Sequence, residues 1–274
     1  MKKLLGFSIF LVFVLIASLT AEAKVTLPAI FSDNMVLQQN TQVNVWGKAA
    51  PGEKVTVKAS WLDKAVTAKA AVNGKWTVKL KTPKATTNQS VTVSGENEIT
   101  INNVLIGEVW LCTGQSNMEF PVSRHPDVKW NTGMLNEAEE LKDADYPEIR
   151  LFHVKHQLAH EGELDDCEGE WLVCNPKNLY DFSAVGFVFG RKLYKELKMP
   201  VGLIQSTWGG THAESWTKLD VMKKNPLYAD VLKDFALEGV KQQKNYCKVP
   251  ATLWNGMIHP ILGYTIKGNI IDVY

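Results

Sequence analysis

The stretch GEVWLCTGQSNMEF (residues 107–120) joins an apolar run to a polar turn. The run begins at Val104 and stays mostly apolar up to Cys112, which is typical of a buried strand. Small and polar residues follow at once, and Ser116 is among them. Because the turns after the strands of an open α/β sheet hold its ligands, Ser116 is a candidate functional residue. Serine is also an ordinary turn residue, and for this stretch alone a structural role is the commoner explanation.

The second part of the chain alternates strand and helix patterns. Residues 146–154 (YPEIRLFHV) and 201–207 (VGLIQST) are typical of strands. Residues 182–197 (FSAVGFVFGRKLYKEL) have apolar positions at helical spacing, with Ser183 as the predicted N-cap. Another strand is predicted within residues 264–274 (YTIKGNIIDVY). This order of strands and helices predicts an α/β fold with a parallel, doubly wound sheet.

Residues 24–103 have a different pattern, in which apolar and polar residues alternate, as in KWTVKL (residues 75–80). Asn73-Gly74, just before this segment, predicts a hairpin because both residues tolerate a positive φ. Several short strands at such spacing predict a small antiparallel β-sandwich. Three tryptophans of this part are expected to be core residues rather than a sugar-stacking platform. They are Trp46, Trp61 and Trp76.

Residues 1–23 have the pattern of a secretory signal peptide. Two lysines precede an almost wholly apolar run over residues 4–19, and Ala21-Glu22-Ala23 matches an A-x-A cleavage site. An uncleaved membrane anchor is the alternative, although the run is short for a membrane span. We therefore expect a periplasmic or secreted protein with no stable membrane insertion after cleavage.

Charge and metal-ligand spacing argue against two other classes of protein. The chain has 30 basic and 29 acidic residues, and residues 1–23 hold two lysines and one glutamate, so the remainder is balanced. A nucleic-acid binder would normally carry a basic surplus. There is no C-x-x-C, and His153 and His156 follow a strand pattern that points them to opposite faces. No metal site is therefore expected. Cys167 and Cys174 are close enough in sequence to pair in an oxidising compartment.

A second polar turn, Trp208-Gly209-Gly210-Thr211, follows the strand predicted at residues 201–207. In a parallel sheet it would open at the same edge as the turn that contains Ser116. Hydrolysis of an ester by a serine needs a hydroxyl, a base and donors for the developing oxyanion. Ser116 would supply the hydroxyl. The backbone N–H groups of Ser116 and Gly210 would supply an oxyanion hole, since glycine lets the backbone approach the substrate.

The neighbours of these residues are candidates for a substrate pocket. They are Gln115, Asn117, Gly209 and His212. For His212, substrate contact and simple packing are both open. Met118 stands where a G-x-S-x-G nucleophile elbow would have its second glycine, so that arrangement is not expected.

Residues 107–122 resemble the nucleophile block of bacterial sialate O-acetylesterases, within the SGNH (GDSL-type) hydrolase superfamily. Further segments from about residue 27 to residue 268 share the resemblance. They are LPAIFSDNMVLQQ, FSAVGFVFGRKLYKEL, PVGLIQSTWGGTHAESWT and LWNGMIHPIL. The resemblance implies an N-terminal β-sandwich (residues 24–103) and a flavodoxin-like, three-layer SGNH domain (residues 104–274). It also implies hydrolysis of O-acetyl esters on sugars, typically sialic acids, without a metal or cofactor. Ser116 would be the nucleophile and Gly210 the oxyanion glycine.

The chain departs from the resembled family after Gly268. The family continues with a WYQGESN-like block, whose asparagine helps to form the oxyanion hole, and with a D-x-x-H block that supplies the catalytic histidine. None of the six histidines here has Asp three residues before it. His259 has Gly256 at that offset and is expected to be structural. The resemblance therefore predicts a hydrolase domain incomplete at its C-terminal end, with impaired activity.

Two alternative functions stay open. Nothing in the sequence identifies the sugar, so an acetyl-xylan or other carbohydrate esterase is one alternative. The other is a non-catalytic glycan-binding protein on the same scaffold, because no base is identified. The expected partner is a sugar or glycan in every case, and an O-acetylated one for an esterase.

Overall fold

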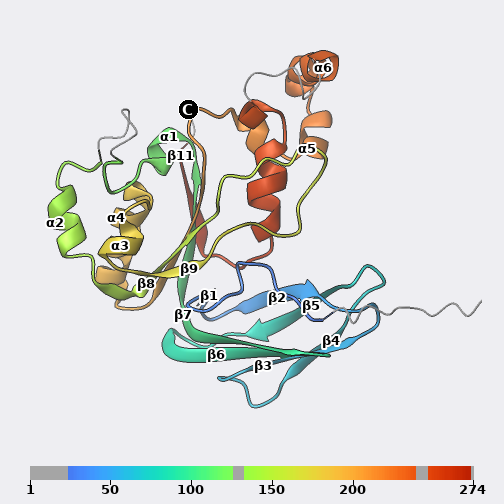
Figure 1. The fold of residues 1–274 in the computed structure, drawn as a ribbon, viewed down its shortest axis with the longest axis vertical. Helices are drawn as coiled ribbons and strands as arrows, with labels where there is room; N and C mark the ends of the chain where they lie inside the picture. Colours follow the sequence, from blue (N-terminus) through green and yellow to red (C-terminus); the bar gives the residue numbers. More distant parts are fainter. Residues whose placement is uncertain (1–23, 126–132, 239–245, 273–274) are drawn as a thin grey trace, which may run out of the picture.

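A computed structural model describes residues 24–125, 133–238 and 246–272. Its fold is a mixed α/β arrangement of two parts, joined by one long strand, β7 (Glu98–Gly114), as Figure 1 shows. The predicted α/β class with an N-terminal β-sandwich is confirmed. The signal peptide predicted at residues 1–23 lies outside the described residues.

The sandwich is built from two sheets. One has the antiparallel order β4-β3-β6-β7, with β1 parallel to β7 beside it, and the other pairs β2 with β5. Its strands are β1 (Val36–Gln38), β2 (Gln42–Lys48), β3 (Lys54–Ala59), β4 (Val66–Lys69), β5 (Lys75–Lys81) and β6 (Thr86–Ser94). In β5, exposed and buried residues alternate, so that Trp76, Val78 and Leu80 enter the core. The period-two pattern of the sequence has this origin.

The Asn73-Gly74 turn forms, but the hairpin ladder predicted around it does not. Gly74 has a φ of +77° and donates its N–H to the carbonyl oxygen of Ala71 at 2.9 Å. Asn73 keeps a negative φ. β4 then pairs with β3 and β5 with β2, so the turn carries the chain from one sheet to the other. Turn chemistry sets the local reversal, whereas the sheet each strand joins depends on distant partners.

β7 continues from the sandwich into a second sheet with the order β9-β8-β10-β7-β11. β10 (Val201–Thr207) lies between β7 and β8 (Tyr146–His153) and is parallel to both. β11 (Gly268–Asp272) is parallel to β7 on its other side. β9 (Trp171–Cys174) is antiparallel to β8. The predicted parallel sheet is confirmed, with β9 as an antiparallel addition.

Helical segments lie on both sides of this sheet, with α1 to α4 on one side and α5 on the other (Figure 1). The main helix is α4 (Ala184–Leu197), and the Ser183 side chain caps it, as predicted, by accepting a hydrogen bond from Gly186 N–H at 3.0 Å. The other α-helices are α1 (Ser116–Glu119), α2 (Glu137–Lys142), α3 (Pro176–Leu179), α5 (Leu219–Lys223) and α6 (Ala229–Glu238). Short 3-10 helices are η1 (Ala213–Trp216), η2 (Pro226–Tyr228), η4 (Tyr246–Lys248) and η6 (His259–Ile261), and η5 (Trp254–Ile258) is a short π-helix.

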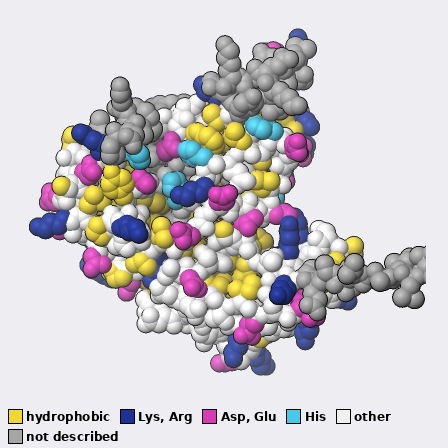
Figure 2. Space-filling view, viewed as in Figure 1, with side chains coloured by type: hydrophobic (Ala, Val, Ile, Leu, Met, Phe, Trp, Pro, Cys, Tyr) yellow, Lys and Arg dark blue, Asp and Glu magenta, His cyan; other side chains and the backbone are white. Residues whose placement is uncertain are grey.

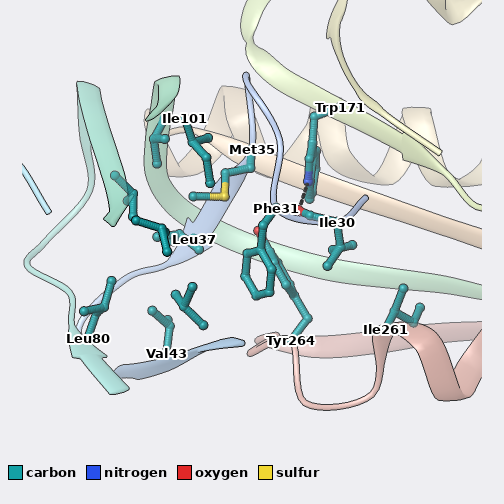
Figure 3. Close-up of a cluster of buried hydrophobic side chains, with 14 of the residues drawn as sticks. Ile30, Phe31, Met35, Leu37, Val43, Leu80, Ile101, Trp171, Ile261 and Tyr264 are labelled. Carbon is teal, nitrogen blue, oxygen red and sulfur yellow. Dashed lines mark hydrogen bonds between the residues drawn. The ribbon is translucent and has the colours of Figure 1, made fainter. Parts of the chain in front are cut away.

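One hydrophobic core runs from the sandwich to the second sheet (Figure 3). Trp171 donates its indole N–H to the carbonyl oxygen of Ile30 at 2.8 Å. Tyr264 donates its hydroxyl to the carbonyl oxygen of Val36, also at 2.8 Å. Because these long-range contacts join the two parts, the sandwich supports the sheet directly. The predicted boundary between the two domains, at residue 104, falls inside β7. That the two parts are separate domains stays a proposal.

The three sandwich tryptophans do not form one platform. Trp76 is 3% exposed, as expected of a core residue. Trp46 is partly buried and packs edge to face against Phe31, with ring centroids 4.5 Å apart. Trp61 is also partly buried and donates its indole N–H to the carbonyl oxygen of Lys81. The expected packing role therefore agrees with the structure.

Charges of both signs are interspersed on the face of the molecule shown in Figure 2. Histidine side chains gather in the upper half of this view, in the part that holds the second sheet. This distribution agrees with the nearly equal numbers of basic and acidic residues in the chain.

Candidate active site

The two polar turns lie at the same edge of the second sheet. β7 and β10 are parallel neighbours, and their register places Thr207 opposite Gly114. Trp208 donates its N–H to the carbonyl oxygen of Gly114 at 3.2 Å. The second turn therefore leaves the sheet directly beside the first, as the sequence predicted.

Ser116 begins α1 and its side chain is exposed. The helix is a single turn, in which Phe120 N–H donates to the carbonyl oxygen of Ser116 at 2.9 Å. Two residues further on, Met118 is only 2% exposed and packs into the core between the sheet and α4. A buried anchor thus holds the turn while the Ser116 hydroxyl faces solvent.

The two glycines of the second turn differ in backbone conformation and in the space around them. Gly210 has a φ of +70°, which favours glycine, and nothing lies within 4 Å of the place where its Cβ would be. Gly209 has no left-handed φ, but a Cβ there would lie 2.8 Å from Glu119 Oε2 and 3.3 Å from Ser116 Oγ. Gly209 is thus the point where the two turns touch, and Gly210 is open to a substrate.

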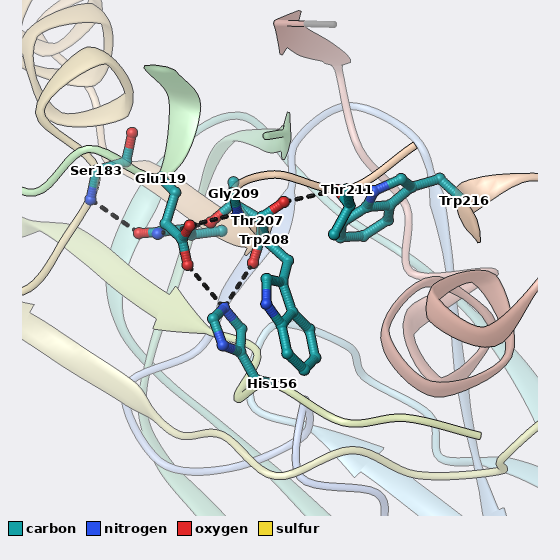
Figure 4. A network of polar contacts seen from close by, with 9 residues as sticks. Glu119, His156, Ser183, Thr207, Trp208, Gly209, Thr211 and Trp216 are labelled. Carbon is teal, nitrogen blue, oxygen red and sulfur yellow. Dashed lines mark hydrogen bonds and ion pairs between the residues drawn. The ribbon is translucent and has the colours of Figure 1, made fainter. Parts of the chain in front are cut away.

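Glu119 links the two turns through a network shown in Figure 4. One carboxylate oxygen accepts a hydrogen bond from Gly209 N–H, and the other lies 2.7 Å from His156 Nε2. His156 Nε2 is also 3.0 Å from the carbonyl oxygen of Thr207. Since both partners are acceptors, we assign the hydrogen to Nε2. The imidazole stacks on Trp208, with ring centroids 4.0 Å apart.

Glu119 is held as a carboxylate. Burial by itself would raise its pKa, but the hydrogen bonds from His156 and Gly209 outweigh burial and lower the pKa below its usual range. Such a carboxylate is a weak base. The arrangement also differs from a Ser-His-Asp triad, in which the imidazole lies between the serine and the carboxylate. Here the Glu119 carboxylate lies between the Ser116 turn and the His156 imidazole. Within residues 24–125, 133–238 and 246–272, no imidazole hydrogen-bonds to the Ser116 hydroxyl.

A cavity of about 210 Å³ opens beside the Ser116 turn. Of the four predicted pocket residues, Gln115 and His212 line it. Asn117 is exposed and, like Gly209, is not part of its lining. The indole of Trp216 forms one wall and donates its N–H to Thr211 Oγ1 at 2.9 Å. Gln115, His212 and Trp216 therefore border a space beside the turn that holds Ser116, and neither Ser116 nor Gly210 is part of its lining.

The remaining histidines of interest are held elsewhere. His259 Nδ1 donates to the carbonyl oxygen of Leu164 at 2.7 Å, and its Nε2 is 3.2 Å from Glu163, in agreement with a structural role. His153 has a buried Nε2 with no partner among the described residues. Burial and the nearby charge of Lys155 lower the pKa of His153 to about 4.

The sequence did not indicate the Glu119–His156 pair. Glu119 lies one helical turn after Ser116, and that spacing was the available signal. The sequence relates His156 only to a metal site, and the strand pattern argues against that site. Its approach depends on β8 lying next to β10, which no local pattern reveals.

Three further features are absent from the part of the chain that the structure describes. It holds no group of three or more His, Cys, Asp or Glu residues arranged to bind a metal ion. None of its helices is both long and apolar enough to span a bilayer. Cys167 and Cys174 are both free thiols, so the disulfide considered for them is not formed.

A parallel sheet with two adjoining turns at one edge, one with an exposed serine and one with an open glycine, is the architecture of an α/β hydrolase-like fold. More specifically, the chain belongs to the carbohydrate esterase family of sialic acid-specific acetylesterases. The model of that family matches residues 106–256, which include both turns.

Relatives of known name are similar to most of the chain. Mouse sialate O-acetylesterase is 31% identical over 280 residues, covering 88% of this chain and 50% of the mouse protein. The human enzyme is 30% identical over 258 residues, covering 86% and 46%. The crystal structure of a carbohydrate acetylesterase from Xanthomonas citri has a TM-score of 0.76 and 29% identity, covering 92% and 52%. The chain spans about half the length of the curated relatives it matches.

Proposed function

We propose that this chain is a carbohydrate O-acetylesterase of the SGNH type that removes acetyl groups from sugars, with sialic acids as the preferred substrates. The observation that carries the proposal is the contact between the two turns, which sets the exposed Ser116 hydroxyl beside the Gly209-Gly210 backbone. Family membership and the names of the relatives support the substrate class. The signal peptide pattern of residues 1–23 supports a periplasmic or secreted location.

In the proposed reaction, Ser116 Oγ attacks the carbonyl carbon of the acetyl ester and loses its proton. The carbonyl oxygen becomes an oxyanion, which accepts hydrogen bonds from the N–H groups of Ser116 and Gly210. The tetrahedral intermediate then expels the sugar oxygen, which takes up a proton, and leaves acetyl-Ser116. Water attacks this ester in the same way, releasing acetate and restoring the hydroxyl.

We also propose that the 274-residue chain hydrolyses acetyl esters slowly. None of the described imidazoles contacts the Ser116 hydroxyl, and Glu119 is too weak a base to replace one. In serine hydrolases, loss of the histidine lowers turnover by a factor on the order of 10⁶. The proton of Ser116 would then pass to water or hydroxide.

The substrate is tested by acetate release from three esters: 9-O-acetylated N-acetylneuraminic acid, acetylated xylan and p-nitrophenyl acetate. We expect the highest kcat/KM with the sialic acid ester, and loss of release in Ser116→Ala. A preference for xylan would transfer the proposal to an acetyl-xylan esterase. Sialic acid binding that survives Ser116→Ala, with no acetate released by either protein, would indicate the glycan-binding alternative.

A further inference from the structure

Glu119 contacts both turns of the site, yet no step of the proposed hydrolysis uses it. We propose that Glu119 is a positioning residue whose carboxylate ties the Gly209-Gly210 turn to the Ser116 turn, with His156 holding the carboxylate in place. The catalytic consequence rests on the proposed function of Ser116 and Gly210. The tie itself is a property of the folded chain and has a readout of its own.

The first half of the tie joins α1 to Gly209. Glu119 is three residues after Ser116 on a single helical turn, so both side chains project from the same short segment. Its Oε2 accepts the Gly209 N–H in a hydrogen bond strengthened by the negative charge. With 17% of its side chain exposed, the carboxylate is largely shielded from competing water. The bond therefore fixes the backbone one residue before the proposed oxyanion donor of Gly210.

The second half of the tie joins the same carboxylate to the end of β10. His156 Nε2–H lies between Glu119 Oε1 and the carbonyl oxygen of Thr207, the last residue of that strand. The imidazole ring is stacked on Trp208, with an angle of 4° between the planes. Thr207, Trp208 and Gly209 are consecutive (Figure 4). His156 contacts the first two of these residues and Glu119 the third, so both side chains hold the same short segment of backbone.

The space around Gly209 independently supports close packing of the two turns. A methyl group there would press on Glu119 Oε2 at 2.8 Å and approach Ser116 Oγ at 3.3 Å. Contacts this short require the neighbours to move. Gly209 does not have a left-handed φ, so Gly209→Ala changes the contact between the turns without straining its own backbone.

Loosening the tie should act on the transition state more than on substrate binding. The Gly210 N–H donates to an oxyanion that exists only during the reaction. A misplacement of about 1 Å in such a group lowers the rate by a factor on the order of 10². We expect kcat to fall by roughly this factor in Glu119→Ala and by about 10-fold in Glu119→Gln, which keeps an acceptor for Gly209 N–H. KM should change little in either.

The experiment compares Glu119→Ala, Glu119→Gln, His156→Phe and Gly209→Ala. His156→Phe keeps a ring to stack on Trp208 but lacks the Nε2–H. The matched control is Glu163→Gln, because Glu163 also pairs with a histidine, His259 at 3.2 Å, and contacts neither turn. Each protein is measured by two readouts: the amide proton shift of residue 209 by NMR, and kcat and KM for p-nitrophenyl acetate.

We expect a downfield Gly209 amide proton in the wild-type protein and in Glu163→Gln, and an upfield shift of this proton in Glu119→Ala. We also expect a lower kcat in Glu119→Gln than in the wild-type protein, and a still lower kcat in Glu119→Ala. If the Gly209 amide proton has the same chemical shift in Glu119→Ala as in the wild-type protein, the proposal is wrong. It is also wrong if this proton moves upfield in Glu119→Ala while kcat stays unchanged. If the wild-type chain hydrolyses no ester while the amide shift depends on Glu119, the proposed function fails and the tie between the turns stands.

Discussion

Thr207 and Gly114 lie opposite each other at the ends of two parallel strands, and this register builds the site. Ser116 follows Gly114 by two residues, and Gly209 follows Thr207 by two residues. The equal spacing explains why a side chain at Gly209 would come within 3.3 Å of the serine hydroxyl oxygen. A shift of one residue between β7 and β10 would separate the two turns.

Ser116→Ala is expected to abolish acetate release without changing stability. The side chain is exposed and makes no described hydrogen bond, so the free energy of unfolding should stay within about 0.5 kcal/mol of the wild type. Urea denaturation and an acetate assay on the same preparations check both parts. Undiminished acetate release by the variant would assign the nucleophile to another residue.

The pH dependence of hydrolysis should lack a plateau near neutrality. Because no described imidazole contacts the Ser116 hydroxyl, the rate should follow hydroxide and rise steadily with pH. An imidazole base would instead level the rate above a pH of about 6.5. The measurement is kcat/KM for p-nitrophenyl acetate between mildly acid and mildly alkaline pH. A plateau removed by His212→Asn would identify His212 as the base and contradict this expectation.

Gly210→Ala should lower both stability and activity. An alanine at a φ of +70° is strained by about 1–2 kcal/mol, and relief of that strain would move the proposed oxyanion donor. Gly52→Ala is the matched control, since Gly52 has a φ of +82° in a sandwich turn far from the serine. Both variants should lose similar stability in urea denaturation, and only Gly210→Ala should lose kcat. Equal activities in the two variants would remove Gly210 from the proposed oxyanion hole.

His153 should make stability depend on pH in the acid range. Its pKa is lowered to about 4 by burial and by Lys155 and His156, against the opposing effect of Glu119. The unfolded chain then binds more protons between about pH 6.5 and 4, so the free energy of unfolding decreases as pH falls through this window. The decrease approaches roughly 1.4 kcal/mol per pH unit.

His153→Gln should reduce this slope, and the exposed His212→Gln should leave it unchanged. Urea denaturation at pH 7 and pH 5 gives the comparison. The same slope in wild-type and His153→Gln proteins would show that other groups cause the acid sensitivity.

Local sequence patterns predicted the parts of the fold that depend on neighbouring residues. The helix capped by Ser183 and the strand ending at Thr207 lie where the pattern placed them. Features set by distant partners were missed. The Asn73-Gly74 turn joins two sheets, because β4 and β5 each pair with a different strand.

The candidate site shows the same division. Ser116 and Gly210 were predicted because each follows a recognisable strand, and parallel strands share an edge. The contact between Glu119 and His156 depends on the order of β8 and β10 in the sheet, which periodicity does not encode.

The most direct test of Ser116 as nucleophile is mass spectrometry of the chain after incubation with p-nitrophenyl acetate. This ester has a good leaving group, so acetylation needs little help from an acid, whereas removal of the acetyl group needs an activated water. Acetyl-Ser116 should therefore accumulate, and the peptide containing residue 116 should carry one acetyl group that Ser116→Ala abolishes. An unmodified Ser116 in a chain that still releases acetate would contradict the account.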